Sequence, residues 1–154
     1  MDIIDLLTSE GVIRDLEATS KKHTLQDLAT RAAAVCGIDE RRIFDVLLER
    51  ERLGSTGVGD GVAIPHGKLP ELGHLFALFA RLDAPVDFDA VDGVPVDLLF
   101  LLLAPESAGA DHLKALTKVS RYLGDAEVCA RLRVAADTDS IYAILTERAA
   151  PHAA

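Results

Sequence analysis

The spacing of hydrophobic positions changes twice along the chain, from a helical period to strand-like runs and back again. In the first part, Ser20 and Asp39 stand at predicted helix starts, and Gly37 and Gly54 follow the predicted helix ends, as capping preferences favour. The elements predicted in this part are a short helix over Ile3–Leu7, a strand over Gly11–Ala18, a helix from Ser20 to Cys36 and a helix over Glu40–Leu53.

The middle part is rich first in glycine and then in apolar runs. Four glycines fall within Gly54–Gly61, so no regular element is predicted there. Asp92-Gly93 is a turn signal between two strands. The last of these strands is apolar almost throughout, which indicates a central strand covered on both faces. The strands predicted in the middle part cover Val62–Pro65, Leu75–Leu82, Val86–Phe88 and Val96–Leu103.

The last part returns to the helical period. It predicts helices over about Ala110–Leu123, Glu127–Val134 and Ser140–Arg148, followed by a flexible tail, Ala149–Ala154. No linker divides the chain, so residues 1–148 are predicted to form a single domain. Helices on either side of a sheet with a buried central strand predict an α/β fold, a three-layer α/β/α sandwich.

The composition fits one substantial hydrophobic core and argues against a nucleic-acid surface. The chain has 154 residues, of which 49% are hydrophobic and 27% charged, which is about the size of one domain. The formal net charge of -9 leaves no broad basic surface for nucleic acid. It fits a protein that docks with other proteins, without singling out that function.

The cysteines and the apolar runs bear on the compartment. Cys36 and Cys129 are isolated and make no disulfide framework, so a reduced, cytoplasmic setting is the simplest inference. The chain opens with an acid where a signal peptide has basic residues. The longest wholly apolar run, Leu98–Ala104, has seven residues, whereas a membrane helix needs roughly 20. A soluble protein without membrane insertion is therefore predicted.

Three common site motifs fail on their spacing. A P-loop needs four residues between its first glycine and Gly-Lys, but five separate Gly61 from Gly67. The glycines at 57, 59 and 61 give GxGxG, where a dinucleotide fingerprint needs GxGxxG. No two histidines stand four residues apart, as they do on a zinc-binding helix. Neither a nucleotide cofactor nor a metal is predicted.

What remains is a single histidine, His66, between Pro65 and Gly67 and just past a predicted strand. Imidazole is a nucleophile near neutral pH because its unperturbed pKa is roughly 6.5, and an N-phosphorylated imidazole can pass its phosphoryl group on. Proline fixes the approach of the chain, and glycine leaves room for a partner's reacting group. The same pattern also fits a loop histidine without a role.

Two further residues favour an anion site beside His66. Arg50 lies seven residues from Ile43, within the apolar face of its predicted helix, where a guanidinium is costly unless an anion meets it. His112 opens a predicted helix at the edge of the face formed by Leu113, Leu116, Val119 and Leu123, where the helix start attracts anions. Arg50 could instead extend outward or pair with an acid, and His112 could be a capping or core residue.

Weaker candidates surround these three residues. Ser55 and Thr56 could donate hydroxyl or backbone hydrogen bonds to a phosphoryl group, or simply shape the turn. Gly67 is a candidate to contact the phosphoryl group through its backbone, and Lys68 could attract anions or be a surface charge.

The run RERLGSTGVGDGVAIPHGKL, Arg50–Leu69, resembles the IIA domains of the bacterial phosphotransferase system, fructose/mannitol superfamily, and among them the nitrogen-regulatory type. The resemblance extends to PVDLLFLLLAP at Pro95–Pro105 and to DHLKAL at Asp111–Leu116, and it covers nearly the whole chain. It implies a mixed central sheet within the three-layer sandwich.

The resemblance also implies roles and partners. His66 would accept the phosphoryl group, supported by Arg50 and His112. The donor would be an HPr-like phosphocarrier protein, itself charged from phosphoenolpyruvate by an Enzyme I-type protein. Regulatory target proteins would then read the phosphorylation state.

Two details bear on the subtype. Sugar-type members usually read PHGT, whereas Lys68 follows His66-Gly67 here, and no IIB or IIC domain is fused. Both favour a regulatory phosphocarrier over the alternatives, a fructose/mannitol-type sugar transport subunit or a non-catalytic interaction module of the same fold.

Asp60 stands where the nitrogen type more often has Asn. Its charge would oppose phosphorylation if it pointed inward, and it is expected to face solvent.

Overall fold

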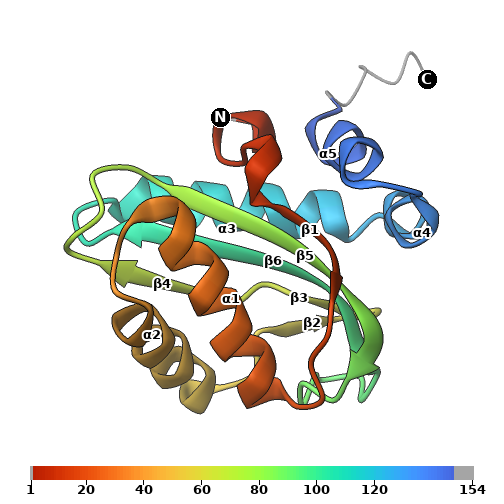
Figure 1. The fold of residues 1–154 in the computed structure, drawn as a ribbon, viewed down its shortest axis with the longest axis horizontal. Coiled ribbons are helices and arrows are strands. Elements are labelled where there is room, and N and C mark those ends of the chain that lie inside the picture. Colours follow the sequence, from red (N-terminus) through yellow and green to blue (C-terminus); the bar gives the residue numbers. More distant parts are fainter. Residues whose placement is uncertain (1, 148–154) are drawn as a thin grey trace.

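The computed structural model describes residues 2–147, and helices cover both faces of a central sheet in it (Figure 1). Within residues 2–147, two short 3₁₀ helices come first and five α-helices follow, of which two precede the sheet's central strands and three come after them. Their bounds are η1 Ile3–Asp5, η2 Ser9–Gly11, α1 Lys21–Cys36, α2 Glu40–Leu53, α3 Gly109–Leu123, α4 Ala126–Val134 and α5 Thr138–Thr146.

In the described part of the chain the sheet has six strands and is mixed, as the family resemblance implied. Its order is β1-β5-β6-β3-β2, and β4 also pairs with β6. Strands β1 and β5 run parallel, as do β3 and β6 and also β4 and β6, while β5–β6 and β2–β3 are antiparallel. The bounds are β1 Val12–Leu16, β2 Gly57–Gly59, β3 Val62–Ala63, β4 His66–Leu69, β5 Phe76–Val86 and β6 Val96–Pro105.

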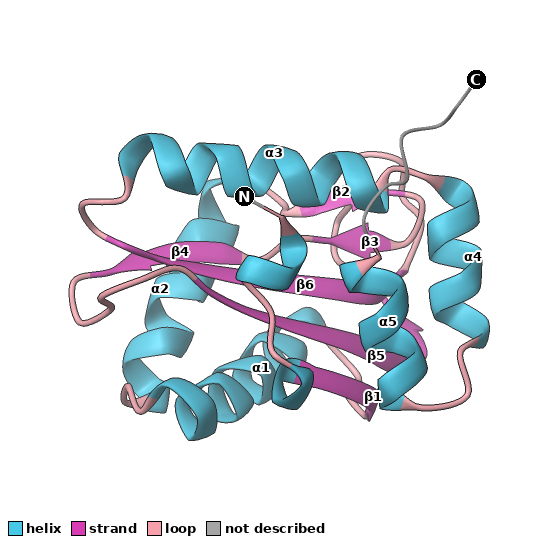
Figure 2. Ribbon diagram, turned by 90° about the horizontal axis from the view of Figure 1, so that it is seen from above, coloured by secondary structure: helices cyan, strands magenta, loops and turns pink. Residues whose placement is uncertain are grey.

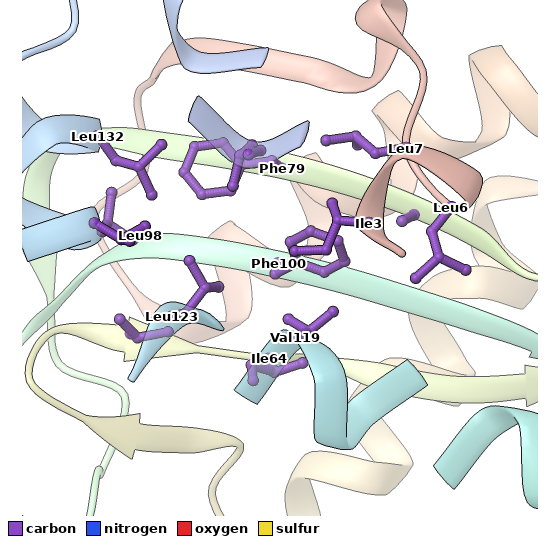
Figure 3. Close-up of a cluster of buried hydrophobic side chains, with 14 of the residues drawn as sticks. Ile3, Leu6, Leu7, Ile64, Phe79, Leu98, Phe100, Val119, Leu123 and Leu132 are labelled. Carbon is purple, nitrogen blue, oxygen red and sulfur yellow. The ribbon is translucent and has the colours of Figure 1, made fainter. Parts of the chain in front are cut away.

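Strand β6 contributes to two hydrophobic cores, because successive side chains point to opposite faces of a sheet. Phe100 and its neighbours two residues away pack with α3, α4, α5 and η1 on one face, where Figure 3 shows Phe100 with Ile3, Phe79 and Val119. Leu99, Leu101 and Leu103 pack with α1 and α2 on the other face. Figure 2 shows the sheet between these two helical layers. The predicted three-layer α/β/α sandwich is confirmed.

The helix boundaries follow the predicted caps closely. The hydroxyl of Ser20 accepts a hydrogen bond from the backbone of His23, and Asp39 accepts one from Arg42. Gly37 ends α1 with a φ of 76°, a conformation that favours glycine. The last helix runs over Thr138–Thr146, where Ser140–Arg148 was predicted, because Asp137 caps it. Arg148 and the predicted tail, Ala149–Ala154, lie outside the described residues.

The glycine-rich segment is where the prediction of no regular element was wrong. Gly57–Gly59 forms β2, which pairs with β3 through a two-residue turn at Asp60-Gly61. Both turn residues have positive φ, 55° and 81°, as a type I′ hairpin turn requires. Asp-Gly was thus a hairpin signal here, whereas Asp92-Gly93 lies in a longer connection between β5 and β6.

Two strand predictions also need correction. The predicted strand Val62–Pro65 ends at Ala63, and His66 begins a new strand in place of a loop. Pro65 has no N–H to contribute to a ladder, although its carbonyl still accepts from Leu102 N at 2.9 Å. The strands predicted over Leu75–Leu82 and Val86–Phe88 are one strand, β5, whose register shifts between Arg81 and Val86.

Within the described residues, no helix is long and apolar enough to cross a membrane.

Candidate functional site

A hollow of about 360 Å³ opens between α2, the start of β4 and the start of α3. It brings His66, Arg50 and His112 together, and Gly67 and Lys68 also line it. Figure 2 shows that α3 begins at the end of the sheet where β4 lies. The sequence did not single out the other lining residues, which are Val46, Glu49 and Leu53.

Hydrogen bonds engage both ring nitrogens of His66. Nδ1 lies 2.8 Å from the carbonyl oxygen of Ile64, which can only accept, so Nδ1 carries the hydrogen of the neutral ring. Nε2 accepts from Nε of Arg50 at 3.2 Å, and an arginine N–H can only donate. The two bonds agree on one tautomer, in which Nε2 holds the free electron pair. His66 is half-buried at the hollow, so Nε2 is the nucleophilic atom of this ring.

The surroundings of His66 lower its pKa below the ordinary value of 6.5. Burial is the largest cause, because it disfavours the charged imidazolium, and the Arg50 charge also lowers the pKa. The hydrogen bond to Ile64 and the charge of Glu51 act in the opposite direction but do not outweigh burial. At neutral pH the ring is therefore neutral and able to act as a nucleophile.

Arg50 lies on the flank of α2. The fully buried stripe of this helix is Ile43, Leu47 and Glu51. Arg50 is half-buried beside it, with Nε on His66 and Nη1 donating to the carbonyl of Gly54 at 2.9 Å. Its guanidinium points to the candidate nucleophile. Leu53, the last residue of α2, is 82% exposed at the rim of the hollow.

His112 lies on the buried face of α3, not at its edge. The buried residues of α3 are His112, Ala115, Val119 and Leu123, whereas Leu113 is 65% exposed. The ring centroids of His112 and His66 are 5.7 Å apart. Burial, and then the nearby His66 and Lys68, lower the pKa of His112. Its Nδ1 is buried without a hydrogen-bond partner among the described residues, which is rare for a buried polar atom.

The hydroxyls of Ser55 and Thr56 are bonded away from His66. Ser55 Oγ donates to the carbonyl of Phe88, and Thr56 Oγ1 donates to Glu51 at 2.6 Å. Neither residue lines the hollow. Glu51, which the sequence analysis missed, is 6% exposed. Its position four residues after Leu47 and eight after Ile43 was a signal that could have placed it on the buried stripe.

Gly67 is needed for packing as well as for the hollow. A Cβ built on it would overlap Cγ1 of Val46, so α2 packs directly on the backbone of β4 at this point. The space that glycine was predicted to leave for a reaction partner is filled on this side by Val46.

Asp60 lies away from the site, as expected. It is exposed in the β2–β3 turn and lines a different hollow with Asp97 and Arg133. Its φ of 55° belongs to the left-handed region, where Asn and Asp are the favoured side-chain-bearing residues. The left-handed backbone conformation therefore explains why either Asn or Asp suits this position.

Within residues 2–147, no group of three or more His, Cys, Asp or Glu side chains is placed to hold a metal ion.

Comparison with known proteins matches this fold and sequence to a family. The family model for the "Phosphoenolpyruvate-dependent sugar phosphotransferase system, EIIA 2" matches residues 5–148. A nitrogen regulatory protein of Bradyrhizobium diazoefficiens is 56% identical over 145 residues, covering 94% of this chain and 95% of the relative. A fructose-specific EIIA component of Haloferax volcanii is 34% identical, covering 96% and 98%. The crystal structure of the nitrogen regulatory protein IIA-Ntr of Neisseria meningitidis matches with a TM-score of 0.89 and 35% identity, covering 94% and 99%.

The packing of Gly67 gives a first prediction. We expect Gly67→Ala to lower the free energy of unfolding by about 1–3 kcal/mol, because the new methyl group overlaps Val46. Val46→Ala removes the overlapping methyl, so the double variant should recover part of this loss. Urea unfolding of the two single variants and the double variant measures the coupling. Additive effects would show that the two side chains do not compete for the same space.

The electrostatics of His66 give a second prediction. We expect an NMR titration to place the pKa of His66 below 6.5, and Arg50→Met to raise it because a neighbouring positive charge is removed. The folded-state pKa lies below that of the unfolded chain. Neutral His66 therefore makes its full contribution to the free energy of unfolding at pH values above the unfolded-state pKa. This contribution is lost as the pH falls through the unfolded-state pKa towards the folded-state pKa.

Arg52→Met is the matched control for this titration, because Arg52 is an exposed arginine in the same last turn of α2. It should leave the pKa of His66 close to the wild-type value. An unchanged pKa in Arg50→Met would contradict the contact between the two side chains.

Proposed function

Because the chain belongs to the EIIA type-2 family of the phosphoenolpyruvate-dependent sugar phosphotransferase system, we propose that it carries a phosphoryl group on Nε2 of His66. The observation that carries this proposal is the pair of hydrogen bonds on the ring. Nδ1 is held by the Ile64 carbonyl, so the electron pair of Nε2 is directed at the hollow beside the Arg50 guanidinium.

The transfer is an in-line displacement at phosphorus. Nε2 of His66 forms the new N–P bond while the N–P bond of the donor's phosphohistidine breaks, and the donor's imidazole keeps that electron pair. Arg50 then exchanges its contact with Nε2 for the phosphoryl oxygens, which a guanidinium binds well. The ring of His66 becomes positively charged on phosphorylation, and its Nδ1–H remains hydrogen-bonded to Ile64. No metal or nucleotide takes part in these steps.

His112 and the backbone of Gly67 complete the proposed phosphoryl site. His112 lines the same hollow, with its ring centroid 5.7 Å from that of His66, and in the proposed site its imidazole donates a hydrogen bond to a phosphoryl oxygen. Fixed donors around a developing charge are usually the largest electrostatic contribution to such a transfer. Ser55 and Thr56, whose hydroxyls are bonded elsewhere, are not part of the proposed contact set.

The proposed donor is an HPr-like phosphocarrier protein in the cytoplasm, charged from phosphoenolpyruvate by an Enzyme I-type protein. The exposed residues Glu49, Leu53 and Lys68 line the hollow and suit a protein donor, whose surface can cover the site during transfer. The proposed output is regulatory, with target proteins that read the phosphorylation state. The similar nitrogen regulatory proteins and Lys68 beside the site support this output.

A sugar transport subunit is the second candidate function. The similarity to a fructose-specific EIIA component supports it, since that relative spans nearly the same length. In that function the phosphoryl group would pass from His66 to a IIB-type protein.

Phosphorylation is the direct test. We expect incubation with phosphoenolpyruvate, an Enzyme I-type protein and an HPr-like carrier to add one acid-labile, base-stable phosphate to the chain, measured by mass spectrometry. His66→Ala should abolish the gain, whereas His74→Ala, a change at an exposed histidine outside the hollow, should keep it. Arg50→Ala should slow the gain by roughly 10²-fold while keeping a cooperative thermal transition. No phosphate on the wild-type chain would refute the carrier proposal.

The regulatory output has a separate test. We expect a pull-down with the phosphorylated chain to recover a different set of proteins from one with the bare chain, because a phosphoryl group changes the charge of the face around the hollow. His66→Ala should recover the bare-chain set under both conditions. If both forms recover the same proteins and a IIB-type protein removes the phosphoryl group from the phosphorylated chain, the sugar-transport function is favoured.

A further inference from the structure

Glu51 is a buried acid next to Arg50, and its bonds lead away from the hollow. One carboxylate oxygen accepts from the backbone N–H of Thr56 at 3.0 Å, and the other accepts from its hydroxyl at 2.6 Å. Nζ of Lys21 lies 3.4 Å from the same carboxylate and supplies a compensating charge. Thr56 is itself only 4% exposed. A buried carboxylate is stable only when it is satisfied in this way.

The bonds continue from Thr56 to the candidate nucleophile. The carbonyl of Thr56 accepts from the backbone N–H of Ile64 at 3.0 Å. The carbonyl of Ile64 accepts from Nδ1 of His66, and Nε2 of His66 accepts from Arg50. Arg50 and Glu51 are consecutive residues of α2, so the chain itself closes these hydrogen bonds into a circuit. The circuit runs through the end of α2, the glycine-rich segment and the start of β4.

We propose that Glu51 and Thr56 are positioning residues for phosphoryl transfer, which hold the Ile64 carbonyl where it fixes the tautomer of His66. The inference rests on the proposed function of His66. Neither Glu51 nor Thr56 lines the hollow, so they act through the backbone that they tie down.

The circuit is needed because the two sides of the site come from different elements. Arg50 is in the last turn of α2, where helices fray, and His66 is the first residue of a short strand. Between them the chain runs through β2, the tight turn and β3. The Glu51–Thr56 contact joins the end of α2 to the residue before β2. The Thr56–Ile64 hydrogen bond joins that residue to the one after β3. A displacement of about 1 Å at such a site can slow a reaction on the order of 10²-fold.

Thr56→Val tests the proposal, because it keeps the shape of the side chain and removes the hydroxyl. Thr24→Val is the matched control, since Thr24 is also buried and its hydroxyl donates to the carbonyl of Ser20 at 2.8 Å, outside the circuit. Two quantities are measured: the tautomer of His66, from long-range ¹H–¹⁵N NMR of the unphosphorylated chain above its pKa, and the single-turnover rate of transfer from a phosphorylated HPr-like protein.

We expect Thr56→Val to reduce the fraction of His66 with hydrogen on Nδ1 and to slow transfer by roughly tenfold or more. Thr24→Val should change neither quantity, even where both variants lower the melting temperature equally. Thr56→Ser, which restores the hydroxyl, should recover both. If Thr56→Val does not fold, Glu51→Gln carries the same test, since an amide nitrogen that cannot accept replaces one of the two carboxylate oxygens to which the N–H and the hydroxyl of Thr56 donate.

The proposal is overturned if Thr56→Val and Thr24→Val give the same tautomer and the same rate, or if Thr56→Ser fails to restore them. An unphosphorylated wild-type chain would instead overturn the proposed function, and the tautomer measurement would still decide whether the circuit orients His66. A wild-type rate in Glu51→Gln, together with an unchanged tautomer, also counts against the circuit.

Discussion

The break in the strand at Pro65 is the constraint on which the candidate site depends. Strands β3 and β4 pair in succession with the same edge of β6, Val62 opposite Leu98 and His66 opposite Leu102. Proline cannot donate to the ladder, so the pairing stops and restarts between them. The interruption leaves the Ile64 carbonyl within reach of the ring of His66, two residues on. The register on β6 is the same before and after the break, so β4 continues along the line of β3.

The sequence predicted the layers of the fold because its strongest signals are periodic. The apolar run at the centre of β6 indicated burial on both faces, and Ser20, Gly37 and Asp39 marked helix ends by capping chemistry that acts within a few residues. The β2–β3 hairpin was missed although its Asp60-Gly61 turn is a local signal, whereas β3 and β4 pair with β6, which lies far along the chain. Gly57 lies against Ala90, and a Cβ there would approach Ala90 to 2.8 Å, a contact that no local pattern indicates.

The site was predicted in part for the same reason. His66 and Arg50 were singled out because they break the local pattern, His66 after a glycine-rich segment and Arg50 within a predicted apolar face, although the structure places Arg50 beside the buried stripe. The exposure of Leu113 and the burial of His112 depend on how α3 is rotated over the sheet. A shift of one residue in the predicted buried face is enough to make the exposed residue appear buried and the buried one exposed. Glu51 was overlooked because its partner, Thr56, lies beyond the end of the helix.

The sharing of β6 by both cores has a consequence for how the molecule opens. Loosening either helical layer exposes one set of side chains of this strand, while the other set stays packed, so β6 itself is released only when both layers separate. Amide hydrogens in β6 should therefore exchange with solvent only through global unfolding. The β2–β3 hairpin is anchored by its second strand, where Val62 and Ala63 are buried in the two cores, while Val58 of β2 is exposed. The slowest-exchanging strand and the candidate nucleophile are thus paired neighbours, which gives His66 a rigid support.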